Sequence, residues 1–309
     1  MSARSVAPVW PGDRAEHLFP KDREVVTGDG TRIRYTVLGP AGAPWVVCCA
    51  GYLCPDNFWA HLAPALATDH RVLILDYRGV GASTEAEGAA LPQRPEDYRL
   101  ERLADDVAAA MDAEDARAAS VVGHSMGTQV ALALWRVRPD LVARLALLAG
   151  PHASPMHTLY GTEVARYLFP LASIGMPALP RAAGRVLMRA LELRVALPVG
   201  RVIRALGPHT PDEGMRTYRW HMSRVDPRTA IWTARGMHAF DARPWLHEVD
   251  VPTLVVVGER DAWCPPEVGD AIDRAIPHAR LVRIAGASHA LPIEFPDLVI
   301  DAVRAHLAS

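Results

Sequence analysis

The sequence predicts an α/β fold in which a mostly parallel, doubly wound β-sheet carries an inserted helical lid. Short runs that are apolar on both faces suit the strands of a parallel sheet covered by helices on both sides. Helical patterns lie between most of these runs, and such alternation is typical of a doubly wound sheet. A long helical segment then interrupts the alternation, which indicates an insertion. The predicted strands are residues 45–49, 72–75, 120–122, 145–148, 254–257 and 281–284.

An antiparallel hairpin is expected at the edge of this sheet. Residues 23–27 and 32–38 have strand character and flank the turn Gly28-Asp29-Gly30. Glycine and aspartate tolerate the backbone conformations that tight hairpin turns require. Residues 1–22 precede the hairpin as an N-terminal extension.

Five helices are predicted around the sheet. The most regular one places Leu100, Leu103, Val107 and Met111 at helical spacing, so that they form one apolar face. Pro139 ends another, because proline cannot continue a helix. The predicted helices are residues 58–67, 97–111, 129–137, 267–276 and 296–307.

The segment 152–235 is predicted to be the lid, and residues 23–151 and 236–309 the core domain. The segment has helical periodicity, several prolines and no good strand pattern. Its charge also differs from that of the core. Between residues 156 and 235 there are twelve arginines and five acidic residues, a balance of +7, which leaves −9 for the rest because the net charge is −2.

The bulk composition excludes several classes of protein. The chain has 309 residues, half of them hydrophobic, so it is long enough to bury a full core. A near-neutral charge without zinc-finger spacing or a basic tail argues against nucleic-acid binding. No run of about twenty apolar residues predicts a membrane span, and the first twenty residues do not resemble a signal peptide. We interpret the free cysteines as packing residues of a cytoplasmic protein; they are Cys48, Cys49, Cys54 and Cys264.

The strongest motif is Gly-His-Ser-Met-Gly at residues 123–127, between a predicted strand and a predicted helix. In that context a sharp turn exposes the serine at the end of the strand, and its neighbours must be small. The helix that follows directs its free N–H groups at the reacting centre. Ser125 is therefore the candidate nucleophile. His124 is expected to point away from it and to pack in the interior.

A serine hydroxyl needs an imidazole to accept its proton, and the imidazolium needs a carboxylate. Asp261 follows the strand 254–257 and His289 follows the strand 281–284, so both should reach the same edge of the sheet as Ser125. The chain order Ser, Asp, His is the one this topology requires. Glu259 competes as the acid, but Asp261 lies further beyond the strand and reaches the site better.

The developing oxyanion needs two hydrogen-bond donors. We expect them to be the backbone N–H groups of Met126 and Tyr52, the latter on the loop after Ala50-Gly51. At this point the chain resembles the α/β-hydrolase superfamily, in its capped, esterase-like branch, over nearly its whole length. The matching segments are residues 50–59, 75–83, 123–127, 258–261 and 286–289.

Two positions depart from the family pattern. Many members have His-Gly where this sequence has Ala50-Gly51, so a side chain that often braces the loop is missing. Thr128 follows the motif where a smaller residue is common. Members with an aspartate nucleophile open epoxides or remove halogens, and Ser125 argues against both activities.

The residues and the resemblance together imply a serine hydrolase that forms an acyl-enzyme. The expected substrate is a carboxylic ester, thioester or lactone with a small or medium apolar acyl group. Activity should fall in acid because the base must be neutral. The same residues could serve an acyltransferase, a cofactor-free haloperoxidase or a lyase, and a non-catalytic ligand-binding relative is a further alternative. No metal or organic cofactor is implied; Gly79 and Gly81 alone do not indicate a dinucleotide site.

The substrate pocket is expected at the lid, although the same side chains could equally pack the lid onto the core. The candidates are Tyr160, Tyr218, Trp220, Met222, Trp232 and Met237 of the lid and its edge, with Trp263 and Leu291 of the core. The basic, amphipathic run 181–206 could attract an anionic substrate, a carrier or a membrane surface, or form a solvated arginine face. The only partner predicted is a small molecule, and monomer and dimer both stay open.

Overall fold

The computed structural model describes residues 17–54, 56–83, 94–158, 181–193, 196–202 and 206–309, together with Tyr167, Phe169 and Ser173. An eight-stranded sheet runs through this part of the chain, in the order β1-β2-β4-β3-β5-β6-β7-β8. The strands are β1 Arg23–Val26, β2 Arg32–Leu38, β3 Trp45–Cys49, β4 Arg71–Leu75, β5 Ala119–His124, β6 Val142–Leu148, β7 Thr253–Gly258 and β8 Ala279–Ile284.

The sheet confirms the predicted fold class. Strands β1 and β2 form the antiparallel hairpin at the edge, and β2 pairs antiparallel with β4. From β4 to β8 every pair is parallel. The six runs that are apolar on both faces are the six parallel strands, because only strands with helices on both sides need to be apolar throughout.

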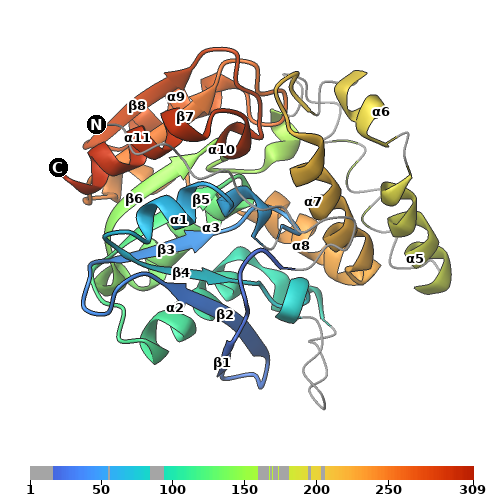
Figure 1. Cartoon of the computed structure of the whole chain (residues 1–309), viewed down its shortest axis with the longest axis horizontal. Coiled ribbons are helices and arrows are strands. Elements are labelled where there is room, and N and C mark those ends of the chain that lie inside the picture. The colour runs from blue at the N-terminus through green and yellow to red at the C-terminus, as the bar shows by residue number, and fades with distance from the viewer. Residues whose placement is uncertain are drawn as a thin grey trace.

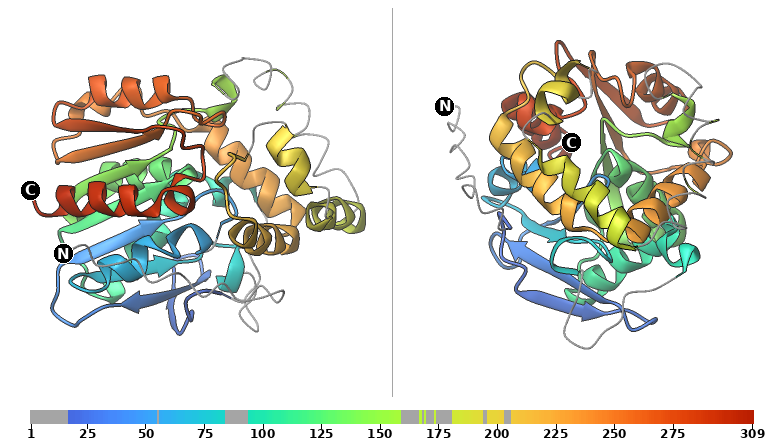
Figure 2. Two further views of the ribbon diagram at one scale, coloured as in Figure 1. Left: turned by 45° about the horizontal axis from the view of Figure 1, so that its top comes forward. Right: turned by 90° about the vertical axis from the view of Figure 1, so that its right-hand side faces the viewer.

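Helices cover both faces of the sheet. Helices α1 (Leu62–Leu66) and α11 (Pro296–Leu307) contact each other on one face, and α2 (Leu100–Ala113) and α3 (Met126–Val137) contact each other on the opposite face (Figure 2). Helix α9 (Pro266–Ala275) packs against β7 and β8. This is the doubly wound arrangement expected from the alternation of strands and helices.

Helix boundaries differ from the predicted ones where the chain turns sharply. The predicted helix 58–67 is a 3-10 turn at Asn57–Trp59 followed by α1. The predicted helix 97–111 begins only at Leu100, because Arg99 is extended (φ −66°, ψ 153°) after the 3-10 turn Pro95–Tyr98. Helix α3 begins earlier than the apolar pattern indicated, because it takes in Met126 and Gly127 of the serine motif and Thr128 after it.

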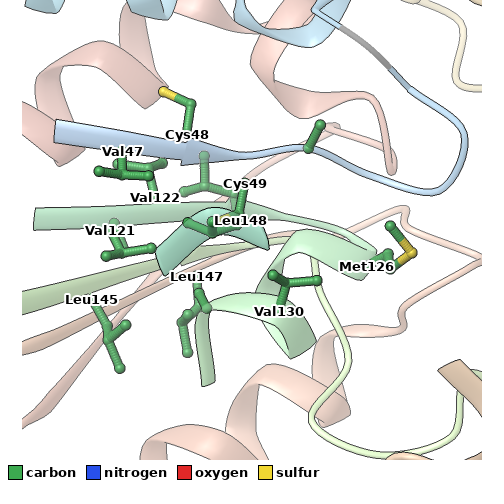
Figure 3. Packing of buried hydrophobic residues seen from close by; sticks show 14 of the residues in the cluster. Val47, Cys48, Cys49, Val121, Val122, Met126, Val130, Leu145, Leu147 and Leu148 are labelled. Atoms are coloured by element: carbon green, nitrogen blue, oxygen red, sulfur yellow. The ribbon is translucent and has the colours of Figure 1, made fainter. Parts of the chain in front are cut away.

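The core lies between the sheet and these helices (Figure 3). Val47 of β3 and Val121 of β5 are fully buried, as are Leu145 of β6 and Val130 of α3. Burial of each such side chain stabilises the fold by roughly 2 kcal/mol. The strands that end beside Ser125 are therefore held rigidly.

The segment predicted as a lid contains helices and no strand where the structure describes it. Its helices are α5 (Arg181–Arg189), α6 (Ala196–Val202), α7 (Asp212–Arg224) and α8 (Pro227–Ala239). They lie together at one end of the sheet, the end toward which β3 points (Figure 1). Helix α8 continues past residue 235 and packs on α2 and on the turn Pro95–Tyr98, where Gly236 permits a close approach to the Tyr98 carbonyl. The predicted boundary at residue 235 thus falls inside a helix.

No helix in the described part of the chain is both long enough and apolar enough to cross a membrane.

The packing of the parallel strands gives a direct stability prediction. Leu147 of β6 is 1% exposed and pairs in the sheet between Gly123 and Val255, so Leu147→Ala leaves a cavity at the centre of the sheet. We expect a loss of about 2–5 kcal/mol in the free energy of unfolding, measured by urea denaturation. The matched control is Leu298→Ala on α11, where the side chain is 52% exposed. It should cost under about 0.5 kcal/mol, and equal losses for the two variants would contradict the packing described here.

Candidate active site

Ser125 sits at a strained turn between β5 and α3. Its backbone has φ 55° and ψ −122°, a conformation that costs a non-glycine residue about 1–3 kcal/mol. Two backbone hydrogen bonds hold it there: Ser125 N–H donates to the Leu148 carbonyl at 3.0 Å, and Thr128 N–H donates to the Ser125 carbonyl at 2.9 Å. The turn thus presents Ser125 at the end of the strand, as the motif predicted.

The turn also requires glycine at residue 127. A Cβ atom there would lie 1.8 Å from the Cys49 carbonyl oxygen, which is rigid backbone at the end of β3. This close approach packs the serine turn against the loop that leaves β3. On that loop, a Cβ at Gly51 would lie 3.3 Å from Ser125 Cβ, so the loop passes directly beside the serine.

The structure brings together the three predicted catalytic side chains. His289 Nε2 lies 2.8 Å from Ser125 Oγ, and His289 Nδ1 lies 2.8 Å from Asp261 Oδ2. An ionised carboxylate can only accept, so Nδ1 carries the proton and Nε2 is free to accept from the serine hydroxyl. This is the geometry in which an imidazole serves as a general base toward serine.

Asp261 is held in place by its own loop. Its side chain is fully buried, and Oδ1 accepts hydrogen bonds from the backbone N–H groups of Trp263 and Cys264, both at 2.8 Å. Oδ2 is thereby directed at His289. The competing acid Glu259 and its neighbour Arg260 are exposed in the same loop, and neither belongs to this hydrogen-bonded chain.

His124 is a packing residue, as the sequence indicated, but it also contacts the loop that carries His289, which we call the histidine loop. It is 1% exposed, stacks on Phe58 with ring centroids 4.6 Å apart, and its Nε2 lies 2.9 Å from the His289 carbonyl oxygen. Burial, with the nearby charge of His289, lowers the pKa of His124 to about 3. His124 is therefore neutral, and its contact with the His289 carbonyl holds the backbone of His289 in place. Nothing in its sequence position pointed to that contact.

The two predicted oxyanion donors belong to segments next to Ser125: the residue that follows it, and the loop at Gly51 that passes beside it. Met126 is the first residue of α3, so its N–H has no partner within the helix. Tyr52 follows Gly51 in a β-turn closed by a hydrogen bond from Cys54 N–H to the Gly51 carbonyl at 3.2 Å. The third residue of this turn, Leu53, has φ 50°, a region that favours glycine.

Lid helices hold Tyr52 at both ends. Its phenol donates to the Ala230 carbonyl of α8 at 2.8 Å, and the phenol of Tyr218 on α7 donates to the Tyr52 carbonyl at 2.9 Å. Burial raises the pKa of both phenols well above the ordinary value, so both stay protonated and able to donate.

Thr128, one of the two departures from the family pattern, is accommodated without disturbing the turn. It is fully buried and its hydroxyl donates to the Gly123 carbonyl at 3.3 Å. A Cβ at Gly150 would lie 1.9 Å from that hydroxyl oxygen, so the missing side chain at residue 150 makes the room.

Glu294 is a polar residue of the site that the sequence reasoning missed. On the short helix α10 (Leu291–Glu294), it accepts hydrogen bonds from the Ser288 N–H and hydroxyl, both at 2.7 Å, and from the Thr210 hydroxyl. Ser288 immediately precedes His289. Glu294 therefore joins the histidine loop to the segment that leads into α7, and no motif in the sequence marks it.

A buried charged cluster lies next to the loop Gly51–Cys54 that carries Tyr52, which we call the oxyanion loop. Lys21 Nζ is 3.1 Å from Asp76 and 3.9 Å from Asp56, and all three side chains are almost completely buried. Burial alone would lower the pKa of His17, but the carboxylate of Asp56, 3.6 Å from Nδ1, and the charge of Asp76 raise it. His17 in turn packs 4.8 Å from His221 of α7. The cluster fixes the segment ahead of β1 and lid helix α7 to the core; Asp56 and Asp76 lie in segments that the resemblance had marked.

Few of the predicted substrate-binding residues contact the catalytic side chains. Trp263 is 41% exposed with its ring centroid 6.2 Å from that of His289, and Tyr218 contacts Tyr52. Trp232 packs against Tyr98 at 5.5 Å, which favours the packing alternative for that residue. Tyr160 lies outside the described residues.

The remaining candidates make packing contacts within the lid or in the core. Trp220 stacks under the Arg224 guanidinium at 3.6 Å, and Met222 packs on the apolar cluster around Leu53. Met237 and Leu291 are buried in the main core.

Many described lid arginines are paired with the lid's own acids. Arg189 and Arg224 contact Glu192, Arg201 contacts Asp212, and Arg216 lies 3.8 Å from Glu213. These pairs favour a solvated arginine face over a specific anion site.

Two further features of the described residues concern metals and thiols. No group of three or more His, Cys, Asp or Glu side chains is arranged there to hold a metal ion. The four cysteines are free and buried, and burial raises the pKa of Cys49 to about 12. Cys48 and Cys49 point to opposite sides of β3 (Figure 3), as adjacent strand residues must. The thiols therefore fit a packing role.

Comparisons with known proteins agree with this architecture. Residues 44–296 match the family described as alpha/beta hydrolase fold. A proline iminopeptidase, PfmaB of Pestalotiopsis fici, is 26% identical over 295 residues, which cover 92% of this chain and 99% of that protein. The crystal structure of the enol-lactonase from Burkholderia xenovorans superposes with a TM-score of 0.72 at 25% identity, covering 93% of this chain and all of the other. An esterase from Exiguobacterium antarcticum has the same TM-score at 17% identity and covers 93% of this chain and 99% of its own.

The burial of His124 predicts how stability depends on pH. The unfolded chain binds a proton at this residue below about 6.5, whereas the folded protein does so only near pH 3. Stability is therefore lost as pH falls from 6.5 toward 3, by up to about 1.4 kcal/mol per pH unit for this one group. His124→Gln keeps a donor at the position of Nε2 and cannot titrate, so its free energy of unfolding should fall less steeply between pH 6.5 and 4.5. The exposed His278→Gln is the control and should keep the wild-type slope; an equally steep slope in His124→Gln would contradict the burial of a neutral imidazole.

Proposed function

This chain belongs to the alpha/beta hydrolase fold family, and from that premise we propose that it is a serine hydrolase that cleaves carboxylic esters through an acyl-enzyme. The single observation that carries the proposal is the hydrogen-bonded chain from Ser125 through His289 to Asp261, with 2.8 Å at each step. In the proposal Ser125 is the nucleophile, His289 the base and Asp261 the acid that orients the base.

The reaction follows from the geometry. His289 Nε2 takes the proton of Ser125 as Oγ attacks the substrate carbonyl, and the buried Asp261 stabilises the imidazolium that forms. The N–H groups of Met126 and Tyr52 receive the oxyanion, with the N-terminus of α3 adding its favourable dipole. His289 then protonates the leaving group, and water attacks the acyl-Ser125 with His289 again as the base. No step needs a metal or an organic cofactor.

The relatives support acyl chemistry rather than one substrate. The names of two of them denote an iminopeptidase and an enol-lactonase, and both of these reactions begin with attack on a carbonyl carbon. We propose an ester, thioester or lactone of a small or medium apolar acyl group for this chain. The exposed ring of Trp263 beside His289 is the best placed of the predicted pocket residues to contact it.

The domain division is part of the proposal. The lid at residues 152–235 covers a core domain formed by residues 23–151 and 236–309, with residues 1–22 as an extension, although α8 crosses the lid boundary. Four buried free thiols fit a reducing compartment, so we propose a cytoplasmic location and a small molecule as the only partner.

The test is a panel of p-nitrophenyl esters, thioesters and lactones of graded acyl length, assayed with wild type and Ser125→Ala. We expect Ser125→Ala to lower kcat/KM at least about 10⁴-fold while the melting temperature is kept, because the nucleophile is lost and the fold is not. The matched control is Ser120→Ala, earlier on β5, which should leave kcat/KM within twofold. Wild-type turnover by Ser125→Ala would end the proposal.

Product analysis separates the related activities. With an alcohol acceptor present, a hydrolase releases mainly the free acid, whereas an acyltransferase yields mainly the new ester. A folded wild type that turns over nothing in the panel, and whose Ser125 does not react with a fluorophosphonate, would instead be a non-catalytic ligand-binding relative.

A further inference from the structure

We infer that Tyr218 is a positioning residue for the oxyanion hole, because it holds the strained turn that carries the donor Tyr52. The inference rests on the proposed function and extends it to the lid. Helix α7, on which Tyr218 lies, then belongs to the machinery that stabilises the transition state and does more than cover the substrate.

The turn Gly51–Cys54 is strained at its third residue. Leu53 has φ 50°, and a turn with a positive φ at this position normally carries glycine or asparagine there. Rotation of the peptide group between Tyr52 and Leu53 would return Leu53 to a common conformation. That rotation would also swing the Tyr52 carbonyl away from its present direction, so the carbonyl needs a partner that holds it.

Tyr218 supplies that partner. Its phenol donates to the Tyr52 carbonyl at 2.9 Å, from a ring that packs edge-on against Phe58 at 5.7 Å. A rotated peptide would lose this bond and leave the phenol unpaired in a buried place. The bond therefore selects the strained form of the turn.

Other lid contacts act on the same loop. Leu53 is 1% exposed in an apolar cluster with Met188 of α5 and with Val225 and Ala230 beside and within α8. Asn57, just beyond the turn, donates to the Gly214 carbonyl of α7 at 3.2 Å. The lid thus contacts both the backbone and the side chains of the oxyanion loop.

The position of the Tyr52 N–H depends on these contacts between the lid and the oxyanion loop. The N–H belongs to the peptide group whose carbonyl, at Gly51, closes the turn with Cys54 N–H. The bond from Tyr218 holds the peptide group on the other side of the Tyr52 Cα, and the bond from the Tyr52 phenol to Ala230 holds its side chain. The loop cannot shift at Tyr52 without losing these bonds, so they also hold the N–H in place. An oxyanion donor must lie within a few tenths of an ångström of its place to be effective.

The experiment compares Tyr218→Phe with a matched lid variant. Tyr218→Phe keeps the ring on Phe58 and removes only the donor to Tyr52. Thr229→Val, one residue before Ala230, removes another hydroxyl between the lid and the core, the 3.2 Å contact with Tyr98, and none of the contacts described above for the oxyanion loop. Both are assayed with the best p-nitrophenyl ester found for the wild type, and both are measured for melting temperature.

For Tyr218→Phe we expect kcat to fall about tenfold, a fraction of the 10²–10³-fold loss typical of a missing oxyanion donor. KM should stay within twofold, and the affinity for an alkyl boronic acid, which imitates the tetrahedral adduct, should weaken about as much as kcat. Thr229→Val should keep kcat, KM and boronic-acid affinity within twofold. If Tyr218→Phe does not fold, Tyr52→Phe, which cuts the bond from Tyr52 to Ala230, is measured in the same way and should also lower kcat with KM kept.

Three results would overturn the inference. One is a Tyr218→Phe enzyme with wild-type kcat and boronic-acid affinity. Another is a loss carried by KM alone, which would mark a substrate contact. The third is an equal loss of kcat in Thr229→Val, which would mark general loosening of the lid. A wild type that hydrolyses no ester and is not labelled at Ser125 removes the proposed function itself, and that outcome is distinct from all three.

Discussion

The close approach of Gly127 to the end of β3 is the constraint on which the rest of the site depends. With the Cys49 carbonyl 1.8 Å from where a Cβ would lie, only glycine lets the serine turn seat against the loop that leaves β3. That contact sets Ser125 beside Gly51, and so beside the turn that carries Tyr52. The nucleophile and one oxyanion donor are thus placed by backbone against backbone, which is stiffer than any arrangement of side chains.

Much of this could be predicted from the sequence, because buried parallel strands leave a strong signal. Runs such as 145–148 must be apolar on both faces, and the polar residues that follow 254–257 and 281–284 must then meet at one edge of the sheet. For that reason the sequence alone predicts that Asp261 and His289 lie with Ser125. Helix starts were less predictable: Leu100 begins its helix only because Arg99 is extended, a local backbone choice that apolar spacing does not record.

The supports of the site could not be predicted, for a different physical reason. Glu294, Tyr218 and His124 act through contacts that span long stretches of chain, and a single polar residue on a helix has no pattern around it. The sequence could not separate pocket from packing among the lid candidates for the same reason, since an aromatic residue such as Trp232 looks alike whether it lines a pocket or packs on Tyr98. Ala50 offers the oxyanion loop no polar side chain, and the loop takes its polar contacts from Tyr218 and α8 instead. The lid and the catalytic edge are therefore one structural unit.

The most direct measurement is to locate the covalent adduct that a fluorophosphonate forms with the folded protein, by mass spectrometry of its peptides. A hydroxyl activated by its imidazole reacts far faster than an ordinary serine, so we predict a single modification on Ser125, abolished in Asp261→Asn and His289→Ala proteins that keep the wild-type melting temperature. Modification of a different residue, or an unreactive Ser125 in the folded wild type, would contradict the account.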